Sequence, residues 1–261
     1  GAIGINSGTS TSGPSGSLRV KSGDSTADST GKLLVIAGNS DTSNGGNIQV
    51  ATGSGGTGQS GSINIQAGTS INNQGGSLQL NAGSSVSNKG GHVNLKSGSG
   101  VASSSGAITV TTLTGASSGS ISVQTGTSQT ATGAVTLNTG SVSTGSAHGI
   151  AVQAGSAQEI GGNILVRSGT STQQNGGSLS IISGKGTAAA GGNIVIGSSD
   201  STSSVTGAIQ MTSGNSAASS GDIQLSTGDS VAESLQGVLV KAGSASNSAN
   251  VLVKAGRSDV S

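Results

Sequence analysis

A unit of about fifteen residues recurs along the whole chain, and this period constrains the fold more than any other feature. Consecutive copies begin at Gly46, Gly61, Gly76 and Gly91, and each has Gly at position 1, aliphatic residues at positions 3 and 5, Ser, Ala or Thr at position 7, usually Gly at position 8, and then a small polar tail. The spacing is fifteen residues as far as Gly106 and thirteen to fifteen beyond it, which gives eighteen units. A fixed period of this kind is typical of repeat architectures.

The alternation inside each unit predicts a β-strand. Aliphatic residues two positions apart lie on one face of a strand, as at Ile48 and Val50 or Ile63 and Ile65. The glycine at position 8, such as Gly53, is expected to end the strand, and the tail, which varies in length between units, is expected to form a turn.

These observations together predict an all-β fold, a parallel β-solenoid (β-helix) of about eighteen repeats of 13–15 residues with no separate caps. Residues 1–261 are expected to form one continuous solenoid, a segment of a longer repeat array. One coil per repeat is preferred, with successive strands about 4.8 Å apart. Two repeats per coil is the alternative. In the preferred geometry, small residues two places after the glycine line the thin interior opposite the aliphatic residues: Ser10, Ser25, Ser40, Gly55, Ser70, Ser85, Gly100, Ser128, Ser171, Ser216 and Ser230.

Composition excludes several other classes of protein. The chain has 49 glycines, no aromatic residue and only 7% charged residues, so an ordinary globular core is not available to it. A net charge of +1 and the lack of aromatic side chains argue against nucleic-acid binding. No run of about 20 apolar residues is present, which argues against membrane insertion. Without cysteine there is neither a disulfide nor a thiolate metal site.

The motifs LQLNAG, from Leu78 to Gly83, and ILVRSG, from Ile164 to Gly169, resemble the core of filamentous-haemagglutinin-type β-helix adhesins. The Gly/Ser-rich tandem form also resembles long secreted repeat proteins of marine algae such as diatoms. The resemblance implies an extracellular protein, secreted or on the cell surface, that serves as a fibre or as the shaft of an adhesin. It carries over no functional residues.

No constellation of residues predicts catalysis, and we expect no catalytic, cofactor-binding or metal-binding site and no cofactor. The acidic residues fall at different positions of the unit, so they do not form the fixed Asp ladder of calcium-binding β-rolls. His92 and His148 are about four units apart, too far for a shared metal ion. No G-x-S-x-G motif on a strand–helix turn indicates a serine nucleophile.

Two sets of residues are candidates for lateral contacts between chains. A basic residue recurs in every fifth unit, between the second aliphatic residue and the small residue. Aliphatic residues also recur in three consecutive tails. The candidates are Lys21, Lys96, Arg167 and Lys241 in the first set and Ile71, Val86 and Val101 in the second. Their expected partners are neighbouring repeats or sister chains in a filament, with a surface polysaccharide as another possibility.

The predicted function is a non-catalytic structural component of an extracellular fibre, filament or adhesin shaft, built by end-to-end stacking of coils. The alternative is an ice-binding β-solenoid module, which would need a regular outward array. The outward positions here are mixed, as at Gln49, Asn64 and Thr109. A polysaccharide-active β-helix enzyme is less favoured, because no aromatic residue is available to hold a sugar.

Overall fold

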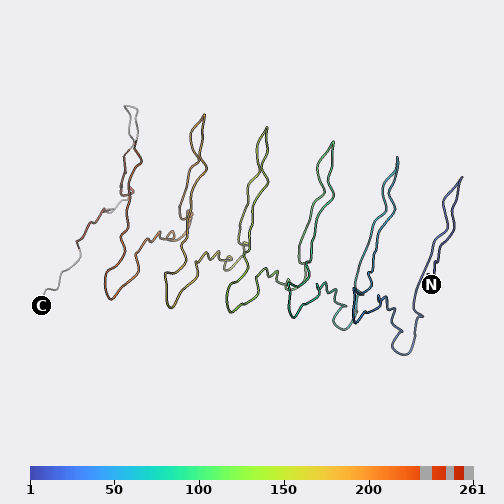
Figure 1. Ribbon diagram of the computed structural model, residues 1–261. Coiled ribbons are helices and arrows are strands. Elements are labelled where there is room, and N and C mark those ends of the chain that lie inside the picture. The colour runs from blue at the N-terminus through green and yellow to red at the C-terminus, as the bar shows by residue number, and fades with distance from the viewer. Residues whose placement is uncertain (230–236, 245–249, 256–261) are drawn as a thin grey trace. The chain divides into compact units, whose positions relative to one another are not determined.

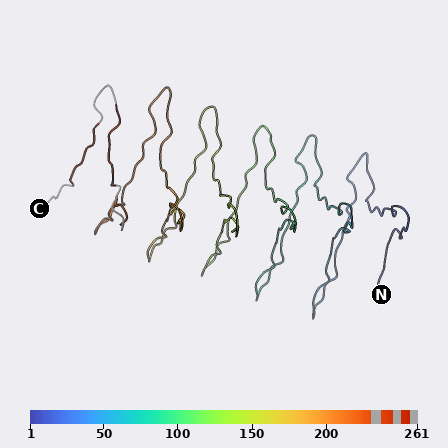
Figure 2. The same ribbon diagram turned by 90° about the horizontal axis from the view of Figure 1, so that it is seen from above.

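The structure, a computed structural model, describes residues 1–229, 237–244 and 250–255. None of these residues lies in a helix or a strand, and the chain alternates between extended segments and bends (Figures 1 and 2). Two parts are distinguished by their internal contacts, Gly1–Gly133 and Ala134–Ser261. The same local unit recurs in both, so each feature below is described within a unit.

The prediction of an all-β parallel β-solenoid, or β-helix, is wrong, because the described residues contain no strand and no sheet. Alternating aliphatic residues indicate which face of an extended segment can be buried, but they do not provide a partner for its backbone. A sheet needs a neighbouring segment about 4.8 Å away that pairs with each N–H and C=O group. With only two aliphatic residues per unit, little apolar area is available to bring such a neighbour into place.

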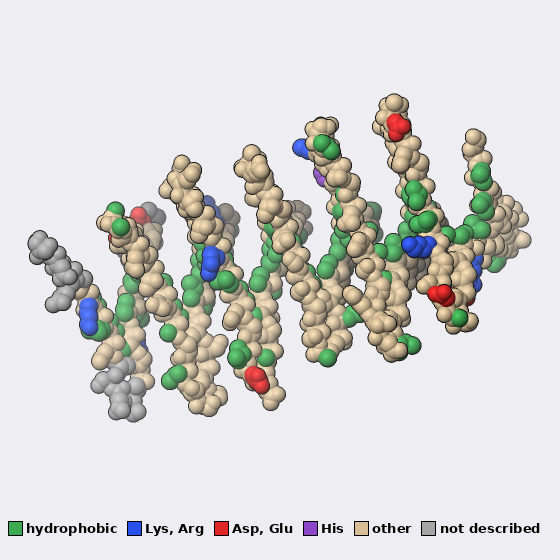
Figure 3. Space-filling model, turned by 90° about the horizontal axis from the view of Figure 1, so that it is seen from below, with side chains coloured by type: hydrophobic (Ala, Val, Ile, Leu, Met, Phe, Trp, Pro, Cys, Tyr) green, Lys and Arg blue, Asp and Glu red, His purple; other side chains and the backbone are tan. Residues whose placement is uncertain are grey.

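The described part of the chain has no buried core, and the aliphatic residues of the repeat are exposed (Figure 3). In the unit that begins at Gly46, Ile48 is 54% exposed and Val50 is 71% exposed. From Leu18 onward, the first aliphatic residue of each unit is less exposed than the second. The alternation therefore does not separate a buried face from a solvent face, which was the basis of the strand prediction.

A backbone hydrogen bond closes a loop between successive units. The N–H of Gly46 donates to the carbonyl of Gly38 at 2.8 Å, and the intervening residues form the tail, which bends at residues 41–43. Equivalent bonds join the glycine at position 8 to the leading glycine of the next unit at Gly53–Gly61, Gly68–Gly76, Gly83–Gly91, Gly98–Gly106, Gly155–Gly162, Gly169–Gly177 and Gly184–Gly192. Each tail closed in this way is a turn, and the regular structure from Gly38 to Gly106 and from Gly155 to Gly192 is a series of closed loops.

The small residue at position 7 packs against the leading glycine of the next unit. A Cβ atom placed on Gly46 would lie 3.1 Å from the Cβ of Ala37 and 3.2 Å from the nitrogen of Gly38. Gly76 and Gly91 stand in the same relation to Ala67 and Ala82, with Cβ distances of 3.3 and 3.4 Å. Apart from Gly186, the only half-buried residues in the described part of the chain occupy position 7: Ser22, Ala37, Ala67, Ala154, Ser168, Ser183 and Ala242.

The serine at position 10 of the unit, two places after the glycine at position 8, forms the turn. The hydroxyl oxygen of Ser40 accepts a hydrogen bond from the N–H of Ser43 at 3.0 Å, and that of Ser70 accepts one from Asn73 at 3.0 Å. Such local bonds between a serine hydroxyl and the backbone favour turns over regular structure. The same bond, to the N–H two or three residues later, is made by Ser10, Ser25, Ser85, Ser128, Ser171, Ser201 and Ser216.

The prediction that the residues at position 10 line a thin interior is therefore wrong. The serines of that set lie on exposed turns, and their hydroxyl groups are used within their own tails. Ser230 lies outside the described residues. A small residue is found at position 10 because a turn needs it there, so a small side chain alone did not distinguish an interior position from a turn position.

Glycine at position 10 forms a different, tighter turn in three units, at Gly55, Gly100 and Gly186. A Cβ atom on Gly55 would lie 2.7 Å from the carbonyl oxygen of Gln59 and would also meet the carbonyl oxygen of Gly58. Gly100 is similarly close to the carbonyl oxygens of Ser103 and Ser104, and Gly186 to those of Ala189 and Ala190. No side chain fits this conformation, because real Cβ atoms do not approach other heavy atoms so closely.

We predict that Gly46→Val opens its loop whereas Gly38→Val leaves it closed. A valine at position 46 would press its Cβ atom against Ala37, while a Cβ atom at position 38 has nothing within 4 Å. The measurement is hydrogen exchange of the amide at position 46, which is protected by the bond to Gly38. We expect protection to fall about fivefold in Gly46→Val, as the loss of about 1 kcal/mol implies. Equal protection in both variants would show that the close contact does not hold the loop.

Candidate interaction surface

The largest candidate surface consists of the aliphatic pairs, defined as the residues at positions 3 and 5 of each unit. They lie in the extended segments between closed loops, where the backbone forms no hydrogen bond to another segment within the described residues. In the described range these residues are: Ile3, Ile5, Leu18, Val20, Leu33, Val35, Ile48, Val50, Ile63, Ile65, Leu78, Leu80, Val93, Leu95, Ile108, Val110, Ile121, Val123, Val135, Leu137, Ile150, Val152, Ile164, Val166, Leu179, Ile181, Ile194, Ile196, Ile209, Met211, Ile223, Leu225, Val238, Val240, Val251 and Val253.

The exposed area of the chain is far above that of a folded monomer of its mass. It amounts to 26,442 Å². A folded monomer of 24.3 kDa would expose about 10,000 Å², and the same chain fully unfolded about 35,000 Å². Soluble monomers rarely expose connected apolar patches of more than a few hundred Å². The aliphatic pairs are consequently the part of this surface with most to gain from burial.

The predicted basic contact residues are exposed and do not gather into one site. Lys21 forms an ion pair with Asp24, three residues later, with 2.6 Å between Nζ and Oδ2. An exposed pair of this kind contributes about 0–1 kcal/mol. Lys96, Arg167 and Lys241 lie on extended segments of their own units, and no salt bridge joins them to an acidic residue within the described part of the chain.

The predicted aliphatic contacts of the tails lie at the bends. Ile71, Val86 and Val101 are each the first residue of a three-residue bend, and each is fully exposed. Each is therefore presented at the loop of its own unit, away from that unit's aliphatic pair. The structure gives no direct contact among these three residues, so their role in a lateral contact remains a prediction.

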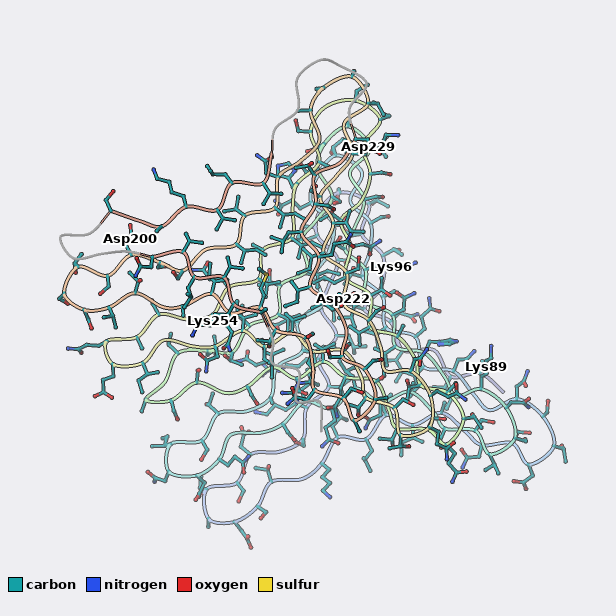
Figure 4. The ribbon with its side chains drawn as sticks, turned by 90° about the vertical axis from the view of Figure 1, so that its left-hand side faces the viewer. Lys89, Lys96, Asp200, Asp222, Asp229 and Lys254 are labelled. Carbon is teal, nitrogen blue, oxygen red and sulfur yellow. The ribbon has the colours of Figure 1, made fainter. Side chains whose placement is uncertain are left out.

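The other charged side chains are dispersed. Figure 4 shows Asp200 and Asp229 on different loops of the second part, while Asp222 lies on an extended segment. Among the described residues, no three His, Asp or Glu side chains come together, and no cavity is formed. His92 and His148 are both exposed. No helix of the described chain has the length and apolar character needed to cross a membrane.

Sequence reasoning missed the contact between position 7 and the next leading glycine. Ala37 and Gly46 are nine residues apart, and the same separation joins Ala67 to Gly76 and Ala82 to Gly91. The signal is present in the sequence, because position 7 is always Ser, Ala or Thr while position 6 varies freely.

Comparisons with protein-family models, with curated proteins and with solved structures find no match. The resemblance to β-helix adhesins and to secreted algal repeat proteins therefore stays a prediction from the motifs alone.

Proposed function

We propose that this protein is a non-catalytic structural component of an extracellular fibre, filament or adhesin shaft, and that it self-associates through its aliphatic pairs. The observation that carries the proposal is the regular exposure of these pairs on a chain with 26,442 Å² of accessible surface. A repeated apolar pair at fixed spacing provides many equivalent contacts along one molecule. Such multiplicity suits a load-bearing assembly.

The energetics favour association over a free chain. Full burial of one Val, Leu or Ile side chain stabilises a complex by roughly 1.5–3 kcal/mol. Apart from Ile3 and Val253, which are more exposed, the residues of the aliphatic pairs are about half to three-quarters exposed, as Val50 at 71% illustrates. About 1 kcal/mol per side chain is therefore available from a partner. Several units acting together can exceed the cost of lost translational and rotational freedom, because that cost is incurred once while the apolar gain grows with the number of units in contact.

The charge distribution also permits close association of identical chains. The net charge is +1 over 261 residues, so copies repel each other weakly. The contacts between copies would be apolar, so added salt would not dissociate the assembly. The sequence has no cysteine, tyrosine or tryptophan and a single methionine, Met211, so few side chains are easily oxidised, which suits exposure outside a cell.

The proposal is tested by sedimentation velocity and electron microscopy of the purified protein at neutral pH. We expect oligomers and unbranched filaments whose mass rises with protein concentration and which persist in 1 M salt. A variant in which the second residue of each pair is serine should remain monomeric under the same conditions. A wild-type protein that stays monomeric up to about 100 µM, equivalent to only about 5.5 kcal/mol of association energy, would overturn the proposal.

A further inference from the structure

The unit spacing differs between two stretches of the chain. From Gly1 to Gly106 every leading glycine follows the previous one by fifteen residues, whereas the steps from Gly106 to Gly162 are thirteen, fourteen, fifteen and fourteen residues. A closed loop is found at every unit boundary from Gly38 to Gly106, whereas within the described residues of the second stretch the bond is formed at Gly155–Gly162 alone. The spacing of the exposed aliphatic pairs is therefore strictly periodic from Gly1 to Gly106 and again, over three shorter steps, from Gly162 to Gly207, but not between these stretches.

We propose that a second copy of this chain covers the aliphatic pairs of residues 1–106, and that the two copies align in registers that differ by steps of fifteen residues. This inference rests on the proposed function. It adds a register rule: the aliphatic pairs of one copy meet those of the other only when the two copies are shifted by whole units of fifteen residues. The occupant is a second copy because only a surface with the same period can cover every pair at once. The exposed area of the chain, 26,442 Å², is far more than the roughly 1,600 Å² that a stable complex needs to bury.

The physical basis of the rule is the position of the pairs within the unit. In a permitted register, Ile48 of one copy meets an aliphatic pair of the other, such as Ile63 and Ile65. In a register shifted by about half a unit, Ile48 would meet a polar tail such as that from Gly53 to Ser60. In such a register all overlapping units lose their apolar contacts at once. Registers shifted by a fraction of a unit are therefore disfavoured in proportion to the number of units that overlap.

The rule makes staggered, open-ended assembly possible. A shift by one full unit removes the contact of one unit and preserves the others, so neighbouring permitted registers differ little in free energy. A staggered pair leaves uncovered units on both copies, and these can receive further copies. Between Gly106 and Gly162 a shift of fifteen residues brings most leading glycines out of alignment by one or two residues. That stretch therefore aligns fully in the unshifted register alone.

Disulfide cross-linking tests the rule directly, since the sequence has no native cysteine. Two differently tagged single-cysteine copies of the full chain are mixed and mildly oxidised. Val50→Cys is the second residue of an aliphatic pair, on the face proposed to form the contact, and the equivalent positions in the next units are Ile65 and Leu80. The matched controls are Thr57→Cys and Asn72→Cys, exposed tail positions that lie 7 and 22 residues from Val50.

We expect the 50–50, 50–65 and 50–80 cross-links to exceed 50–57 and 50–72 by at least about fivefold, and the tail-to-tail 57–72 cross-link to form as well. Sedimentation of the same variants before oxidation shows separately whether they associate. Association with equal cross-linking at all positions overturns the register rule and leaves the proposed function in place. Monomeric variants, beside a wild-type protein that is also monomeric, overturn both.

Discussion

Serine in place of Ile48, Val50, Ile63 and Ile65 is expected to weaken self-association about a thousandfold. Each substitution removes about 1 kcal/mol of apolar burial, because these side chains are already partly covered in the single chain. Four substitutions remove about 4 kcal/mol, and every 1.4 kcal/mol changes a dissociation constant tenfold. The measurement is the concentration dependence of sedimentation of a fragment of the repeat array, residues 31–106, which limits the number of units in contact.

The matched control is the variant in which Ile71, Val86 and Val101 are replaced by serine. These residues are as apolar as those of the aliphatic pairs and more exposed, but they lie at the bends. We expect this control to associate within about fivefold of the wild-type fragment. If the control loses association while the substitutions in the pairs have no effect, then the tails form the contact and the assignment to the aliphatic pairs is wrong.

Alanine at Gly55 is expected to abolish the tight turn of its unit. The Cβ atom would lie 2.7 Å from the carbonyl oxygen of Gln59, so the backbone from Gly53 to Ser60 must rearrange. The structure also places the N–H of Gly55 at 3.3 Å from the hydroxyl oxygen of Ser60, a hydrogen bond that the rearrangement would break. Backbone chemical shifts measured by NMR should change throughout this tail and stay unchanged in the neighbouring units.

Two further substitutions in the same unit sharpen this prediction. Gly56→Ala should leave the turn intact, because a Cβ atom at that position has nothing within 4 Å. Gly55→Ser should convert the tail to the form seen at Ser40, in which the hydroxyl oxygen accepts the N–H of the residue three positions later. Equal disturbance by Gly55→Ala and Gly56→Ala would instead indicate that any loss of glycine, and not the close approach to Gln59, governs the turn.

The position of the turns could be predicted from the sequence. The tail varies in length and is rich in Gly and Ser, and the structure bends there, for example at residues 41–43 and 71–73. Turns depend on local interactions, such as the bond from the N–H of Ser43 to the hydroxyl of Ser40. A single unit therefore contains all the information that specifies its turn.

The arrangement of the extended segments could not be predicted in the same way. The alternation at Ile48 and Val50 indicates which side chains share one face of the segment. Whether that face is buried depends on a partner that lies outside the unit. The sequence shows no partner, and the structure leaves both side chains exposed. The candidate contact residues Lys96 and Arg167 illustrate the same limit, because their spacing can be read from the sequence while their partner cannot.

The loop between Gly38 and Gly46 is closed by contacts that reach no further than the next unit boundary. Gain or loss of one whole unit by unequal recombination between copies of the repeat would therefore preserve every remaining loop. Alleles with different numbers of units would encode proteins that have the same local structure and differ mainly in the length of the repeat array. Natural variation in this protein should consequently accumulate as changes in the number of units more readily than as insertions within an extended segment.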